Sequence, residues 1–72
     1  MKYYVTEDIM YLEDVGKYKS YGIELREGEC VIEKIRDIDI SREGVEELCA
    51  LCNKLELSPI HFRDVIEDYI SR

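Results

Sequence analysis

The spacing of apolar side chains changes near residue 40. Before that point Val, Ile and Tyr tend to alternate with polar residues, and after it apolar residues recur at steps of three and four. Alternation is typical of half-buried strands, and the longer step is typical of amphipathic helices. The chain therefore predicts one α+β domain over residues 1–72, with a three-stranded antiparallel β-meander over 1–40 and a two-helix hairpin over 41–72 packed on one sheet face.

The first strand is expected over residues 2–12, joined to the second strand by residues 13–16. Val5 and Ile9 are expected on the face that packs against the helices. Glu7 interrupts this alternation. Either a β-bulge or an edge position at which Glu7 reaches water would reconcile the pattern, and a charged residue on an edge strand also discourages aggregation.

A second turn is expected around Gly28, which can supply the positive φ of a two-residue hairpin loop. If Arg26 lies opposite Glu29, then Leu25 pairs with Cys30, and Ile23 and Ile32 face each other two residues further along. This register makes Cys30 a core residue.

Two helices follow with clear start signals. Ser41 is a good N-cap, and Ser58 followed by Pro59 places proline at the first helical position, where its missing N–H costs nothing. The short connection at residues 56–57 predicts a helical hairpin. The expected core consists of Ile23, Leu25, Cys30, Ile32, Leu48, Cys49, Cys52, Phe62, Val65, Ile66 and Tyr69.

Two helices leave the second face of the sheet uncovered. This face is expected to carry Tyr4, Met10, Val31 and Ile35. A chain of 72 residues buries only about 60% of its unfolded surface, so its monomer is expected to be marginally stable. We therefore expect a homodimer that pairs this open face or an edge strand.

The charge balance bears on the class of partner. Seventeen acidic and ten basic residues give a net charge of −7, spread over both halves of the chain. Nucleic acids and anionic membranes both attract clustered Lys and Arg, so neither is expected as a partner. The first residues lack the apolar stretch of a secretory signal, which favours the cytoplasm and free thiols for the three cysteines.

The cysteines suggest one possible metal site. Cys49 and Cys52 form a C-x-x-C pair, and with Cys30 and His61 they provide a Cys₃His set suited to zinc. The pair falls in the middle of a predicted helix rather than on a tight turn, and its position on the apolar stripe favours packing in the core. Zinc binding stays as the alternative.

A second constellation lies on the last helix, at His61, Asp64, Glu67 and Asp68. His61, Asp64 and Asp68 fall within about 60° of one another on a helical wheel. Three interpretations are open: a solvated flank in which Arg63 pairs with Glu67, a contact with a basic patch on a partner protein, or a metal site.

Catalysis is not expected. The single histidine has no nucleophile placed beside it, and the four glycines are scattered without forming a phosphate-binding loop. No cofactor is predicted.

Residues 58–68, together with residues 39–41 and 51–53, resemble a family of small proteins of unknown function from Gram-positive (Firmicute) bacteria. The resemblance spans roughly residues 20–70 and implies a cytoplasmic bacterial protein, with no implication for a reaction.

The expected function is a small non-catalytic interaction or regulatory module that presents the His61 flank to a basic surface. A metal-binding domain is the alternative. An acidic decoy of nucleic acid ranks last, because the carboxylates do not form phosphate-like rows.

Overall fold

A computed structural model describes residues 1–71 and shows a three-stranded antiparallel sheet followed by two helices. The strands are β1 (Lys2–Leu12), β2 (Gly16–Glu27) and β3 (Cys30–Asp39), in the spatial order β1-β2-β3. The helices are α1 (Arg42–Lys54) and α2 (Pro59–Ile70). The predicted α+β meander with a helical pair is therefore confirmed.

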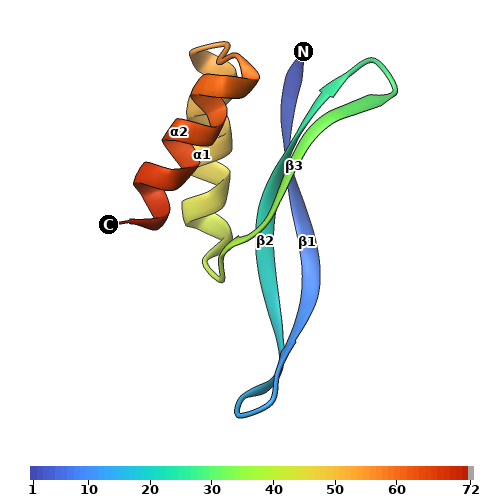
Figure 1. The fold of residues 1–72 in the computed structure, drawn as a ribbon, viewed down its shortest axis with the longest axis vertical. Helices are drawn as coiled ribbons and strands as arrows, with labels where there is room; N and C mark the ends of the chain where they lie inside the picture. The colour runs from blue at the N-terminus through green and yellow to red at the C-terminus, as the bar shows by residue number, and fades with distance from the viewer. Residues whose placement is uncertain (72) are drawn as a thin grey trace.

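Both helices lie on the same side of the sheet (Figure 1). α1 packs mainly on β1 and β2, whereas α2 packs on β3. Neither helix is long and apolar enough to span a lipid bilayer, as judged over the part of the chain that the structure describes.

The helix start signals act as expected. The Ser41 hydroxyl accepts a hydrogen bond from the backbone N–H of Gly44 at 3.2 Å, which satisfies one of the unpaired donors of the first turn. Pro59 opens α2 directly after Ser58.

The β1–β2 ribbon is regular along its whole length. It pairs one to one from Lys2 with Arg26 to Leu12 with Gly16. Glu7 is exposed on this edge strand, so the edge position accounts for its place in the pattern and no bulge is needed. Figure 1 shows the lower part of the ribbon extending past the ends of the helices.

The β2–β3 register differs from the prediction by one residue at the turn. Glu27, rather than Arg26, marks the end of the pairing and lies opposite Cys30. Gly28 takes the first turn position with φ +61°, while Glu29 has no positive φ, which is the pattern of a type II′ turn. Cys30 is consequently exposed, and its predicted place in the core is wrong.

A bulge then reverses the alternation in β3. Pairing passes from Arg26 with Val31 to Leu25 with Glu33, which leaves Ile32 without a partner and 41% exposed. Ile32 is therefore not a core residue. Ile35, predicted on the open face, pairs with Ile23 and packs against the core beneath the helices.

The core forms between the sheet and the helices. Three members, Tyr3, Ile38 and Val45, were absent from the predicted set, whereas Val65 and Tyr69 are only half-buried around it. The buried apolar residues are Tyr3, Ile23, Leu25, Ile38, Val45, Leu48, Cys49, Cys52, Phe62 and Ile66.

Candidate interaction surfaces

The predicted flank of α2 is exposed. His61, Asp64, Glu67 and Asp68 all lie on the outer side of the helix, because Phe62 and Ile66 turn inward and are buried. Arg63 does not pair with Glu67 as one interpretation expected.

Arg63 instead binds β3. Its Nη2 lies 2.6 Å from Oε2 of Glu33, and its Nε donates to the same oxygen at 3.0 Å. This fork links α2 to the sheet and leaves the carboxylates of Asp64 and Glu67 without an ion pair among the described residues.

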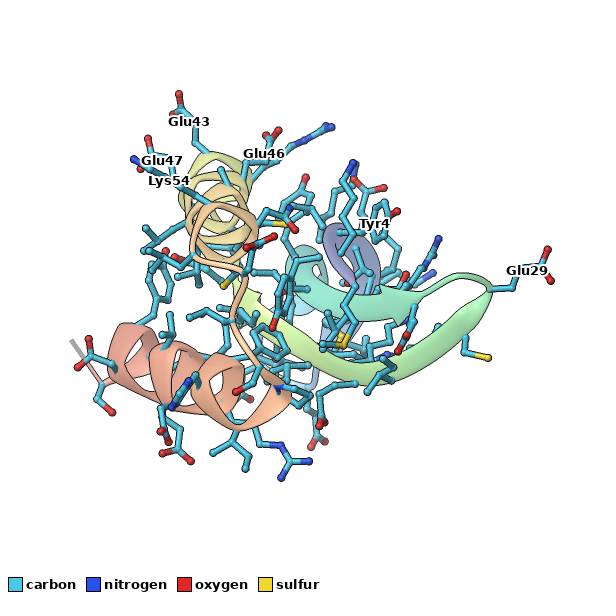
Figure 2. All side chains as sticks on the ribbon, turned by 90° about the horizontal axis from the view of Figure 1, so that it is seen from above. Tyr4, Glu29, Glu43, Glu46, Glu47 and Lys54 are labelled. Atoms are coloured by element: carbon cyan, nitrogen blue, oxygen red, sulfur yellow. The ribbon has the colours of Figure 1, made fainter. Side chains whose placement is uncertain are left out.

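α1 adds carboxylates to the same layer. Figure 2 shows Glu43, Glu46 and Glu47 pointing away from the rest of the molecule. Glu46 pairs with Arg42 at 3.3 Å, whereas Glu43 and Glu47 form no ion pair in the described part of the chain. Residues 41–71 together contain seven acidic and three basic residues, so the outer surface of the helical layer is anionic.

The four candidate zinc ligands do not meet. Cys30 begins β3 beside the β2–β3 turn and is exposed. Cys49 and Cys52 belong to α1 and are buried on its inner side, whereas His61 is exposed near the start of α2. Within residues 1–71 no group of three or more His, Cys, Asp and Glu side chains is arranged to hold a metal ion.

The two buried thiols are poor nucleophiles at neutral pH. Burial raises the pKa of the Cys52 thiol to about 11, with a smaller contribution from Cys49, and burial also raises the pKa of Cys49. Both thiols therefore stay protonated and act as small apolar groups in the core.

A polar cluster at the β3–α1 junction was not predicted. The Tyr69 hydroxyl donates to Oδ2 of Asp39 at 2.6 Å, and the Ser41 backbone N–H donates to Oδ1 at 3.2 Å. These hydrogen bonds lower the pKa of Asp39, with Tyr69 as the larger cause. The cluster ties the end of α2 to the start of α1, and no local sequence signal connects residues 30 positions apart.

The open sheet face carries a charged pair at its centre. Glu24 lies at its centre, only 6% exposed, and forms an ion pair with Arg26. Tyr4 and Lys34 are its neighbours on the two flanking strands, and the Arg26 guanidinium stacks 4.9 Å from the Tyr4 ring centre. A paired, covered carboxylate in the middle of this face argues against face-to-face packing with another sheet.

Apolar side chains gather instead on the part of the ribbon beyond the helices. Ile9 is 63% exposed, and Tyr11 and Val15 are each 68% exposed. Leu12, Val15, Tyr18 and Ile40 line part of a shallow hollow on this end of the molecule. The sequence signal was present, because the end of β1 is apolar on both faces and a single helical layer covers only one.

The outward backbone groups on the outer edge of β1 are hydrogen-bonded to a helix only at the first end of the strand, among the residues described. Asn53 of α1 caps Tyr3, because its Oδ1 accepts from the Tyr3 N–H at 2.8 Å and its Nδ2 donates to the Tyr3 carbonyl at 3.0 Å. Outward-facing backbone groups recur at every second residue of an antiparallel edge strand, so those of Val5, Glu7, Ile9 and Tyr11 face the same way. Among the described residues they have no hydrogen-bond partner on that side.

Comparison with known proteins gives one finding. Residues 1–72 match the model of a protein family described as a family of unknown function (DUF6514). No curated protein and no solved structure matches the chain. The chain therefore belongs to the DUF6514 family.

Proposed function

We propose that this protein is a small, non-catalytic interaction module that works as a homodimer and presents its anionic helical layer to a basic surface on another protein. Its expected setting is the cytoplasm of a Gram-positive (Firmicute) bacterium, where its three thiols stay reduced.

The observation that carries the proposal is the set of exposed carboxylates without cations. Glu43, Glu47, Asp64 and Glu67 extend from two helices into solvent and form no ion pair in the described part of the chain. Two of the three cations in the layer are already engaged, Arg42 by Glu46 and Arg63 by Glu33. A basic partner would relieve the mutual repulsion of these carboxylates and accelerate encounter.

The non-catalytic part of the proposal is supported by the state of the potential nucleophiles. Cys49 and Cys52 are buried with raised pKa values, and His61 is exposed, with no thiol or hydroxyl of residues 1–71 bonded to it. The hollow beside the ribbon is open to solvent and mainly apolar.

The test compares two variants of equal charge. One neutralises the helical layer through Glu43→Gln, Glu47→Gln, Asp64→Asn and Glu67→Gln. The matched control neutralises the two hairpin turns through Glu13→Gln, Asp14→Asn, Glu27→Gln and Glu29→Gln, since these residues lie away from the helical layer and are exposed. Each immobilised protein is exposed to bacterial cytoplasmic extract, and retained proteins are quantified by mass spectrometry across a salt series.

A basic protein retained by the wild type and the control, lost by the helical-layer variant and released between about 0.1 and 0.5 M salt supports the proposal. Equal retention by both variants, or retention that is insensitive to salt, contradicts it. Sedimentation tests the homodimer separately.

A further inference from the structure

The two edges of the sheet differ in their capacity to pair with another strand. β3 is interrupted by the bulge at Ile32 and by the left-handed backbone of Asp37, with φ +54°. Bulges of this kind protect an edge from further pairing. β1 is regular over all its residues, and beyond Tyr3 its outward N–H and C=O groups have no partner in the described part of the chain.

The free edge coincides with exposed apolar side chains. Ile9 and Tyr11 point to the helix side of the ribbon, beyond the reach of the helices, while Leu12 points to the other side. Beyond the Asn53 cap, Arg42 and Glu46 of the helical layer share a hollow with Val5, Thr6 and Glu7 of this edge. From Asp8 onward the ribbon extends past the helices, which leaves the helix side of this edge uncovered (Figure 1), while on the other side Arg36 of β3 pairs with Asp8 at 3.7 Å.

We infer that β1 pairs antiparallel with β1 of a second copy, about a two-fold axis at Ile9, to form a continuous six-stranded sheet. This inference rests on the self-association part of the proposed function and assigns it to one edge and one register.

Charge selects the register. A two-fold axis at Glu7 or Asp8 would place that carboxylate opposite its own copy, which is unfavourable. An axis at Thr6 or earlier would bring the second copy against Arg42 and Glu46 of α1. An axis at Met10 or beyond would shorten the paired segment.

The axis at Ile9 avoids each of these costs. It pairs residues 6–12 of both copies, with Glu7 opposite Tyr11 and Asp8 opposite Met10 of the second copy. The outward groups of Glu7, Ile9 and Tyr11 then form about six backbone hydrogen bonds across the axis. The two Ile9 side chains lie side by side, and each covers exposed apolar surface of the other. Seven paired residues on each side correspond to a small interface, so we expect dissociation in the micromolar range.

The first test is a charge at the axis with a matched control. Ile9→Lys places two ammonium groups side by side, whereas Ile60→Lys makes the same substitution at a 74% exposed isoleucine of α2. Sedimentation equilibrium should give the wild type and Ile60→Lys a mass of about 17 kDa, twice the 8.5 kDa of one chain. Ile9→Lys should dissociate at least about 100-fold more readily, with an unchanged melting curve in the dilute monomer.

The second test fixes the register. In a Cys30→Ser background, Ile9→Cys should form an intermolecular disulfide on mild oxidation, because residues at the axis lie about 5.5 Å apart at Cα. Tyr11→Cys should not, since it faces Glu7 of the second copy.

The outcomes separate the two proposals. A wild type that is monomeric at all concentrations overturns both this interface and the homodimer. A dimer that survives Ile9→Lys and fails to cross-link through Ile9→Cys leaves the homodimer standing and refutes the β1 edge. Cross-linking through Tyr11→Cys instead refutes the Ile9 register.

Discussion

The two halves of the β1–β2 ribbon have the same pairing and contrasting surroundings. In the half under the helices, Tyr3, Ile23 and Leu25 are buried. In the projecting half, Ile9 and Tyr11 lie on the same face of the same strands and are mostly exposed. Strand pairing continues without interruption across both halves, so backbone hydrogen bonding alone does not require a hydrophobic cover.

This contrast shows what the helical layer contributes. The helices bury the apolar side chains of one half of the β1–β2 ribbon in the core. They leave the apolar side chains and the β1 edge of the other half exposed. An apolar, regular edge strand without a cover invites pairing with another chain. The projecting half is therefore where we propose that two copies pair, and the proposed basic partner would bind the anionic helical layer instead.

The largest expected effect comes from the same truncation made in each half. Ile23 is fully buried, so Ile23→Ala creates a cavity in the core and should lower the free energy of unfolding by about 2–5 kcal/mol. Ile9→Ala should change it by less than about 0.5 kcal/mol in the monomer. Urea unfolding of both variants at sub-micromolar concentration makes the comparison, and similar losses would show that the projecting half is covered within one chain.

A smaller effect is expected at Gly22, where the covered half meets β3. A Cβ placed there would lie 2.3 Å from the backbone oxygen of Ile35, so the strands would have to shift. Gly22→Ala should destabilise the fold by about 1–3 kcal/mol. Lys19→Ala, at an exposed position on the same strand, serves as the control and should stay within about 0.5 kcal/mol in the same thermal melts. An unchanged melting temperature for Gly22→Ala would be inconsistent with this close approach.

The hydrogen bonds from Asn53 to the Tyr3 backbone should contribute less to the free energy of unfolding than the packing at Gly22. Asn53→Ala removes both hydrogen bonds to the Tyr3 backbone and should cost about 1–2 kcal/mol. It should also accelerate hydrogen exchange at the Tyr3 amide. Lys54→Ala, on the exposed side of the same helix, should leave that amide unaffected. Slow exchange in Asn53→Ala would indicate another acceptor at this edge.

The smallest effect concerns pH. The pKa of Asp39 is lower in the folded state than its usual 3.8, because Tyr69 and the Ser41 N–H stabilise the carboxylate. Its contribution to stability is therefore complete above pH 4 and is lost as the pH falls through the folded-state pKa. Asp39→Asn and Tyr69→Phe should both flatten the stability profile below pH 4, while Asp14→Asn at the exposed ribbon turn should keep it. A profile unchanged by Tyr69→Phe would exclude this hydrogen bond as the cause.

Much of the fold was predictable because its signals are local. The change from alternation to a helical step located the boundary near residue 40, Ser41 and Pro59 marked both helix starts, and Gly28 marked the turn. Each of these signals depends on backbone chemistry within a few residues.

The register of β3 was not predictable from the same signals. Gly28 can occupy either position of a two-residue turn, and the position it takes moves Cys30 from opposite Leu25 to opposite Glu27, at the end of the hairpin. The bulge at Ile32 then moved the side chains that follow it to the other face. Together these two local choices placed Cys30 in solvent and Ile35 in the core.

The candidate interaction surfaces were also only partly predictable from the sequence. The exposure of the α2 flank followed from its helical period, but the attachment of Arg63 to Glu33 depends on packing between residues 30 positions apart. The apolar end of β1 was visible in the sequence, but its projection beyond the helices was not, because the reach of the helices over the strands depends on how both are placed in three dimensions.

The most direct test of the account is amide hydrogen exchange along β1 at two protein concentrations. The amides of Asp8 and Met10 point toward β2 and should be protected at both concentrations. Those of Glu7, Ile9 and Tyr11 point outward and should exchange quickly in the dilute monomer and at least about tenfold more slowly at high concentration. Outward amides that exchange equally fast at both concentrations, in a protein whose mass has doubled, would contradict the assignment of the β1 edge as the dimer interface.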